Sequence, residues 1–171
     1  MPTGKNRVPM APLRAALEKA GLANVRTYIQ SGNVIAASRT TQAGVETLVH
    51  DVIQSEFGGD LAVLARTPAE LRGRLARNPF QGEETTRLYF TLLAKKPEAG
   101  LLKALLARDH APDKIAVIGD MVYLLCATRY SDAKQLNNNV IERRLKLDAT
   151  TRNHNTMTRL IELAAEHGAA G

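Results

Sequence analysis

Cysteine and aromatic residues are scarce in this chain. Its 171 residues include one cysteine and no tryptophan, and the aromatic fraction is 4%. A single cysteine excludes an intrachain disulfide, which fits a protein kept in a reducing compartment. So few aromatic side chains argue against a platform on which single-stranded bases stack.

The sequence also lacks a long apolar run. No stretch reaches the roughly 18 apolar residues of a transmembrane helix, and the opening "MPTGKNRVPM" has no apolar core of a signal peptide. We therefore expect a cytoplasmic protein with no membrane partner. The apolar fraction of 44% is ordinary for a globular chain, and 171 residues suffice for one domain or two small ones.

Acidic residues are outnumbered by basic ones. The 23 Lys and Arg against 17 Asp and Glu give a net charge of +6. Between Arg129 and Arg159, seven basic and three acidic residues leave a net charge of +4. Such an excess favours an anionic partner, either a small molecule or nucleic acid. A solvated basic face would give the same counts, so charge alone leaves both interpretations open.

The spacing of apolar residues predicts one order of elements twice. In the first half we expect helices at 8–21 and 42–59, a hairpin around Gly32 and a strand at 60–66. The tight turn of the hairpin is predicted at Ser31-Gly32, where Gly32 and Asn33 can take positive φ. After a further helix from residue 67, the second half repeats the order. It has a strand at 87–94, a helix at 97–108, a hairpin around Gly119, and helices at 137–145 and 150–168.

With one strand added before the first helix, each half would read as the β-α-β-β-α-β split unit. We therefore predict an α+β fold of two ferredoxin-like sub-domains from an internal duplication, with the first strand missing and an extra C-terminal helix. The sub-domains would cover residues 1–78 and 79–171. The missing strand would leave an open sheet edge near residues 25–37, for a second copy of the chain or further sequence to cover.

Three segments carry a resemblance to a known family. These are "GKNRVPMAPLRAALEKAGLANVRTYIQSGNVI", "NPF" at Asn78–Phe80 and "ATTRNHNTMTRL" at residues 149–160. Together they resemble the domain of unknown function 1697 family of uncharacterised bacterial proteins, in which a Trp often replaces His154. The resemblance implies a duplicated ferredoxin-like arrangement and supplies no reaction. Relatives begin with a strand and an Arg-Gly-Ile-Asn segment, so "MPTGKN" is a shortened N-terminus by comparison.

The segment "TTRNHNT" suggests an anion site. Thr150 or Thr151 is predicted as the N-cap of the last helix, and the backbone N–H groups of a first helical turn attract anions. That turn would hold an arginine where acidic residues are usual. With the polar loop after residue 128, the predicted ligand-binding residues are Arg129, Tyr130, Lys134, Thr150, Thr151, Arg152, Asn153 and Asn155. An ordinary capped helix with a solvated arginine is the alternative.

Two other functions remain open. An enzyme acting on a small phosphorylated or carboxylated substrate would use Glu142, Tyr130 or His154 to transfer protons. An oligomeric interaction module would use the open strand edge. The histidines show no metal-ligand spacing, so we expect no metal site, and no motif indicates a cofactor. The sequence therefore does not decide whether the protein is an enzyme.

Overall fold

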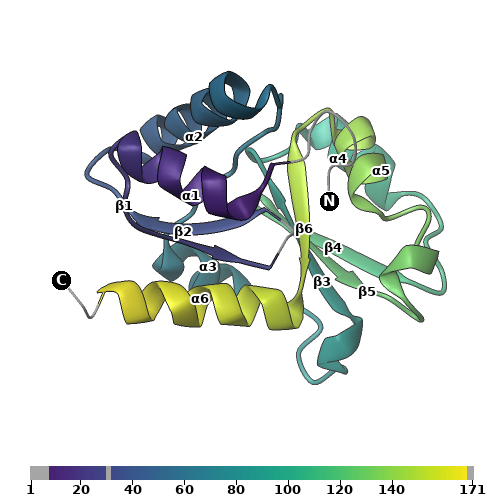
Figure 1. Ribbon diagram of the computed structural model, residues 1–171. Helices are drawn as coiled ribbons and strands as arrows, with labels where there is room; N and C mark the ends of the chain where they lie inside the picture. The colour runs from purple at the N-terminus through teal and green to yellow at the C-terminus, as the bar shows by residue number, and fades with distance from the viewer. Residues whose placement is uncertain (1–7, 30–31, 169–171) are drawn as a thin grey trace. The chain divides into compact units, whose positions relative to one another are not determined.

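The computed structural model describes residues 8–29 and 32–168. Within them the chain is an α+β protein with two antiparallel sheets and six α-helices (Figure 1). It divides into two compact units: unit 1 comprises residues 1–68 and 159–171, and unit 2 comprises residues 69–158. In the described part of the chain, no helix is long and apolar enough to cross a bilayer.

Unit 1 is built on a hairpin covered by two helices. Strands β1 (Ala23–Tyr28) and β2 (Asn33–Ala37) pair antiparallel. Helices α1 (Met10–Lys19) and α2 (Gln42–Phe57) lie on the same side of this hairpin (Figure 1). Both helices and both strands occur where the sequence predicts them. The buried core of the unit consists of Val8, Leu13, Leu17, Leu22, Val25, Val49 and Ile53.

The strand predicted at residues 60–66 is wrong. Leu61 and Val63 still pack against the core of unit 1, which explains the strand-like alternation of the sequence. The backbone groups of Ala65 bond to side chains of α2: its N–H donates to the Glu46 carboxylate at 2.7 Å, and its carbonyl accepts from the Gln42 amide at 3.0 Å. Alternation alone does not make a strand, because a strand also needs a neighbour whose backbone groups it can bond.

The turn between β1 and β2 differs in detail from the prediction. Gly32 has the expected positive φ of 78°. Asn33 does not, because it already begins β2, where its side-chain amide donates to the carbonyl of Tyr28 at 3.0 Å. Ile29 takes the positive φ instead, at 48°. Ser31, predicted as part of this turn, lies outside the described residues.

Unit 2 contains a complete β-α-β-β-α-β sequence of elements. These are β3 (Leu88–Leu93), α4 (Ala99–Leu106), β4 (Lys114–Ile118), β5 (Met121–Leu125), α5 (Asn138–Leu145) and β6 (Ala149–Asn153). All neighbouring strands are antiparallel and stand in the order β4-β5-β3-β6. This element order is that of the split β-α-β unit. The chain continues into helix α6 (His154–Gly168).

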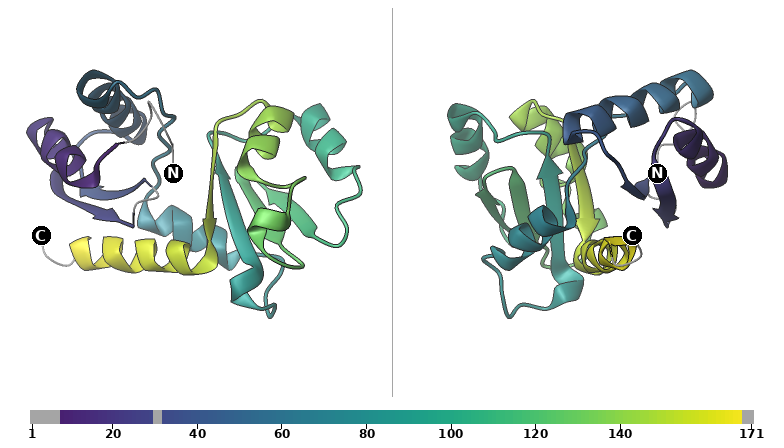
Figure 2. Two further views of the ribbon diagram at one scale, coloured as in Figure 1. Left: turned by 45° about the vertical axis from the view of Figure 1, so that its right-hand side comes forward. Right: turned by 90° about the vertical axis from the view of Figure 1, so that its left-hand side faces the viewer.

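The two faces of the unit 2 sheet are covered by different helices. Leu93, Val122 and Leu124 point to the face under α4 and α5, where they pack with Leu105 and Ile141. On the opposite face the rings of Phe90 and Tyr123 meet edge to face, with centroids 5.8 Å apart. The Tyr123 hydroxyl donates to the carbonyl of Arg74 at 2.7 Å, which places α3 (Pro68–Ala76) on that face (Figure 2).

Helix α3 belongs to unit 2, although the sequence suggested a boundary ten residues later, between 78 and 79. The Arg74 guanidinium donates through Nε and Nη2 to the two carboxylate oxygens of Asp120, at 2.8 and 2.7 Å. Asp120 lies in the turn between β4 and β5, so the ion pair holds α3 to the sheet. Both side chains are about one-fifth exposed, at 18% and 19%, which limits screening of the pair by solvent.

Replacing Asp120 with Ala should lower the free energy of unfolding by about 1.5–3 kcal/mol, because it removes two hydrogen bonds to a charged group. The exposed Asp148, for which no side-chain contact is seen in the described residues, gives a matched control. We expect Asp148→Ala to change stability by less than about 0.5 kcal/mol. Urea titration of the three proteins measures this, and equal stabilities would show that the ion pair does not hold α3.

Candidate anion-binding site

Residues 149–153 form strand β6, so the predicted helix N-cap at Thr150 or Thr151 is wrong. The strand pairs with β3 from Ala149 opposite Leu93 to Asn153 opposite Tyr89. Threonine favours strands, and β3 offers an edge whose backbone groups need partners. Tertiary pairing therefore overrides the local cap signal. Helix α6 begins at His154, and the side-chain oxygen of Asn153 caps it by accepting the N–H of Thr156 at 2.8 Å.

The strand conformation places Thr151 and Arg152 on opposite faces of the sheet. Thr151 lies opposite Thr91, and Arg152 lies opposite Phe90, on the face that α3 covers. The Arg152 guanidinium donates to the Thr150 hydroxyl at 2.7 Å and to the Thr151 carbonyl at 2.8 Å. Burial lowers the pKa of this guanidinium. The expected position of Arg152 in the first turn of a helix is therefore also wrong.

Two of the predicted binding residues belong to a polar network between α5 and the sheet. The Thr151 hydroxyl donates to the Asn138 side-chain oxygen at 3.0 Å and lies 2.7 Å from the Thr91 hydroxyl. Asn138 in turn donates its backbone N–H to the Tyr130 hydroxyl at 2.8 Å and its amide N–H to the Ala149 carbonyl at 3.1 Å. The network fixes the start of α5 against β6, so Thr151 and Tyr130 have a structural role.

The three candidates for proton transfer do not meet at one point. The Glu142 carboxylate accepts the Ala149 N–H at 2.9 Å and ties α5 to β6. The Tyr130 ring stacks on Tyr89 with centroids 4.7 Å apart. The His154 ring lies near Phe90 instead, with centroids 6.1 Å apart, and its Nδ1 is buried with no hydrogen-bond partner among the described residues. Tyr130 and Glu142 thus act on the α5 side of the sheet, and His154 on the other.

The exposed members of the predicted site are Arg129, Lys134 and Asn155. Arg129 precedes a short 3₁₀ helix (Tyr130–Asp132), and Lys134 follows it, so both stand near the start of α5. Asn155 lies in the first turn of α6. Asn153 is also exposed, although its side chain is engaged as the cap of that helix. The structure therefore separates the predicted cluster into three exposed side chains and residues whose side chains bond within the fold.

Most basic side chains of the 129–159 segment have no acidic partner. Arg159 pairs with Glu162 at 3.0 Å in unit 1. Five other basic side chains form no hydrogen bond or ion pair within residues 8–29 and 32–168. They are those of Arg129, Lys134, Arg143, Arg144 and Lys146. The first two lie near the start of α5 and the last three at its end. The eight residues of α5 separate the groups by roughly 12 Å.

A pocket between α4 and α5 adds an arginine that the sequence analysis missed. Arg108, just after α4, lines it together with Arg143 and Arg144 of α5. Arg108 is 35 positions before Arg143, and only the packing of α4 beside α5 brings them together. No local sequence pattern could have indicated this. In the part of the chain that the structure describes, no three His, Cys, Asp or Glu side chains gather as metal ligands.

Comparison with known proteins identifies a family and a structural relative. The family described as "Protein of unknown function (DUF1697)" matches residues 2–123. The solved structure of the conserved bacterial protein SP0830 from Streptococcus pneumoniae is similar, with a TM-score of 0.70 and 19% sequence identity, over 96% of this chain and 93% of that one. At this identity the likeness concerns the fold alone. No curated protein matched the chain.

Replacing Asn153 with Ala should cost about 1 kcal/mol of stability, because the first turn of α6 loses its cap. Asn155→Ala is the matched control, since Asn155 lies in the same turn, is exposed and makes no side-chain hydrogen bond among the described residues. It should change stability by less than about 0.5 kcal/mol. Thermal unfolding followed by circular dichroism compares them. An unchanged Asn153→Ala would mean that this cap contributes little to stability.

Proposed function

Because the chain belongs to the DUF1697 family, whose description assigns no reaction, we propose its function from its charges: unit 2 binds an anionic ligand at basic residues around α5. The ligand classes that fit are a nucleotide, the phosphates of a nucleic acid and a phosphorylated metabolite. All three offer phosphate oxygens, which lysine and arginine bind through charge-assisted hydrogen bonds.

The observation that carries this proposal is the unneutralised charge at the two ends of α5. The five basic side chains there have no acidic partner among the described residues. None of the three carboxylates of this segment forms an ion pair with these cations: Glu142 accepts a backbone N–H, Asp132 accepts from the Thr128 and Ser131 hydroxyls at 3.3 and 3.4 Å, and Asp148 has no side-chain partner among the described residues. Like charges that repel one another without a partner in the fold are relieved when an anion binds.

The predicted binding residues take different parts in this proposal. Arg129 and Lys134 are exposed and available to contact a ligand directly. The hydroxyls of Tyr130, Thr150 and Thr151 already form hydrogen bonds within unit 2. These three residues therefore hold neighbouring elements in place and do not contact the ligand themselves. Asn153 and Asn155 stand at the first turn of α6, where backbone N–H groups favour an anion. Arg152 is less accessible than the sequence suggested, because it lies half-buried in β6.

The enzyme alternative has less support than binding. Tyr130 and Glu142 serve the fold through their hydrogen bonds to Asn138 and Ala149. His154 lies on the other side of the sheet, beside Phe90. A general acid and a general base must both reach the reacting atoms, within about 2.6–3.2 Å or through one water. Residues split between two faces of a sheet do not provide that geometry, so we favour a binding protein.

A second candidate function is pairing with another copy of the chain, and it rests on the sheet of unit 1. We propose that the two units arose by duplication, since α1-β1-β2-α2 repeats the order α4-β4-β5-α5. In unit 2 the first strand, β3, lies between β5 and β6. Among the described residues of unit 1, no strand holds the equivalent place beside β2. An open edge of this kind accepts a strand from another chain.

The charge proposal predicts salt-dependent binding that Arg129 and Lys134 strengthen. Wild type should bind pyrophosphate and a 20-nucleotide single strand at ~50 mM salt, where phosphate contacts are strong. For the nucleotide strand, replacing both residues with Gln should lower the slope of log K against log salt by about 1.4 units, or 0.7 for each lost contact. Fluorescence anisotropy over a salt series measures that slope.

The control is the double variant Arg72→Gln and Arg77→Gln, which removes the same charge from two exposed residues in and just after α3, on the opposite face of the unit 2 sheet from α5. Its slope should stay near that of wild type. Equal losses in both double variants would reduce the effect to net charge and contradict a site around α5. If wild type bound neither probe at ~50 mM salt, the proposal of anion binding would be wrong.

The pairing candidate predicts a dimer that protects β2. Light scattering should give twice the 18.6 kDa chain mass at high protein concentration. Hydrogen exchange of the amides at Asn33–Ala37 should slow as the dimer forms, because strand pairing removes them from water. The amides of β5, which β3 and β4 already flank, serve as the internal control. A monomer at every concentration would contradict this candidate.

A further inference from the structure

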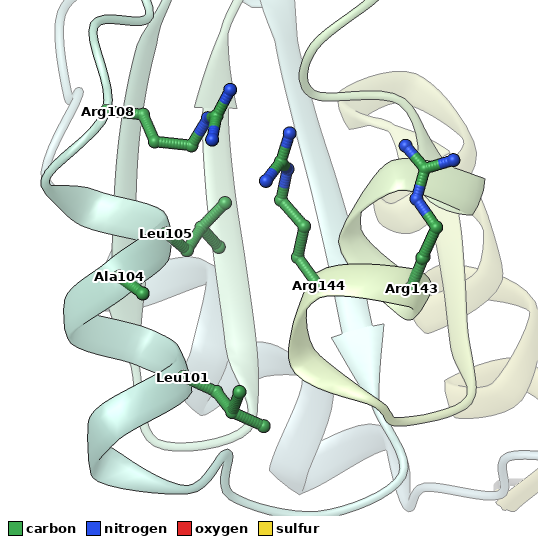
Figure 3. Close-up of a pocket in the computed structure, with 6 residues that line it drawn as sticks. All are labelled: Leu101, Ala104, Leu105, Arg108, Arg143 and Arg144. Carbon is green, nitrogen blue, oxygen red and sulfur yellow. The ribbon is translucent and has the colours of Figure 1, made fainter.

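Three arginines share the pocket between α4 and α5. The pocket has a volume of about 300 Å³ and is lined by Leu101, Ala104, Leu105, Arg108, Arg143 and Arg144. The guanidinium groups of Arg108 and Arg144 point toward one another from the two helices, and that of Arg143 stands on the farther side of α5 (Figure 3). All six residues belong to unit 2, so the pocket lies within one compact unit.

The charges of this pocket are not neutralised by the fold. No carboxylate lines it. The side chains of Arg108, Arg143 and Arg144 form no hydrogen bond or ion pair with any described residue. The Nε of Arg144 is also buried without a hydrogen-bond partner there. A buried donor that belongs to a charged group and has no acceptor is costly, so a structural role alone gives little reason for it.

Helix polarity explains only part of this arrangement. Arg143 and Arg144 lie in the last turn of α5, where a cation interacts favourably with the helix dipole. That effect requires neither a third arginine from another helix nor the burial of Arg144 Nε. Arg108 approaches from beyond the end of α4, so it adds repulsion when the pocket is empty. An anion between the two helices would satisfy Nε and the charges of Arg108 and Arg144 together, with Arg143 adding positive charge nearby.

We propose that this pocket binds a phosphate ester with a compact aliphatic group. Guanidinium groups match phosphate oxygens in paired hydrogen bonds, and the two positive charges of Arg108 and Arg144 suit a dianion. Leu101, Ala104 and Leu105 form the apolar wall for the organic part. No aromatic side chain lines the pocket, so it offers no surface on which a nucleobase stacks. Its volume lies at the lower end of the range for small-molecule sites, which favours a small ligand over a polymer.

This assignment rests on the proposed function, anion binding by unit 2, and places the ligand at the pocket arginines. The test compares wild type with Arg108→Gln and Arg144→Gln in calorimetric titrations with butyl phosphate, inorganic phosphate, AMP and a 20-nucleotide strand. Wild type should bind butyl phosphate most tightly. Each variant should weaken that binding at least about tenfold, the effect of losing a hydrogen bond to a charged group. Arg144→Lys keeps the charge without the paired donors and should bind with intermediate affinity.

The matched control is Arg72→Gln, because Arg72 is an exposed arginine of α3 in the same unit and does not line the pocket. It should bind like wild type. Melting curves without ligand guard against a folding defect: Arg144→Gln should keep or raise the melting temperature, since it removes a buried unpaired donor. Butyl phosphate should raise the melting temperature of wild type but not of the pocket variants.

The outcomes separate this assignment from the broader one. If phosphate esters bind all variants as well as Arg72→Gln, the pocket is not the site, although the protein still binds anions. If only the nucleotide strand binds, the ligand is a polymer and the small-molecule class is wrong. If no probe binds wild type, both the pocket assignment and the proposed function fail. A lower melting temperature of unliganded Arg144→Gln would assign Arg144 a structural role.

Discussion

The pairing of β3 with strands on both sides is the constraint on which unit 2 depends. β5 lies along one edge of β3 and β6 along the other. Successive residues of β3 also point to opposite faces of the sheet. Phe90 packs on the α3 side, and the Thr91 hydroxyl contacts the Thr151 hydroxyl on the α5 side. The backbone of β3 cannot leave its polar groups unpaired in this interior. This need converts "ATTRN" from the start of a helix into a strand, and with it moves four residues of the predicted site into the sheet, which are Thr150, Thr151, Arg152 and Asn153.

Because residues 149–153 form a strand, the polar residues of the predicted site lie on two different faces of the sheet. A strand alternates its side chains between two faces, so Thr151 joins Asn138 and Tyr130 under α5, while Arg152 joins Phe90 on the other face. The internal hydroxyl and amide groups satisfy one another, as buried polar groups generally do. The basic side chains at the two ends of α5 are not satisfied in this way, since no carboxylate of the described residues forms an ion pair with them. They remain directed to solvent or to the α4–α5 pocket, which is why the anion hypothesis now rests on arginines and lysines rather than on a helix cap.

A comparison of the two units shows what a central strand contributes to a sheet. Unit 2 has β3 between β5 and β6, and its final strand pairs over five residues. In unit 1 the segment after α2, residues 60–66, has Leu61 and Val63 on the core but its Ala65 backbone bonded to side chains of α2. Hydrophobic burial thus places a segment against a core, whereas strand structure requires a partner backbone. The same absence of a central strand among the described residues leaves the far edge of β2 open.

The sequence by itself determined the α+β class, the positions of most helices and strands, and the basic character of the second half. These follow from apolar periodicity, turn residues and charge, which are local properties that the chain carries wherever it folds. Tertiary structure decided whether Ala149–Asn153 is helix or strand, whether residues 60–66 pair, and that α3 attaches to unit 2 through Arg74 and Asp120. It also decided which cations share a pocket: Arg108 and Arg144 are 36 positions apart in the chain, and only the packing of α4 beside α5 brings their guanidinium groups together. Contacts between distant segments depend on the backbone partners and packing surfaces that folding supplies, and no local pattern encodes them.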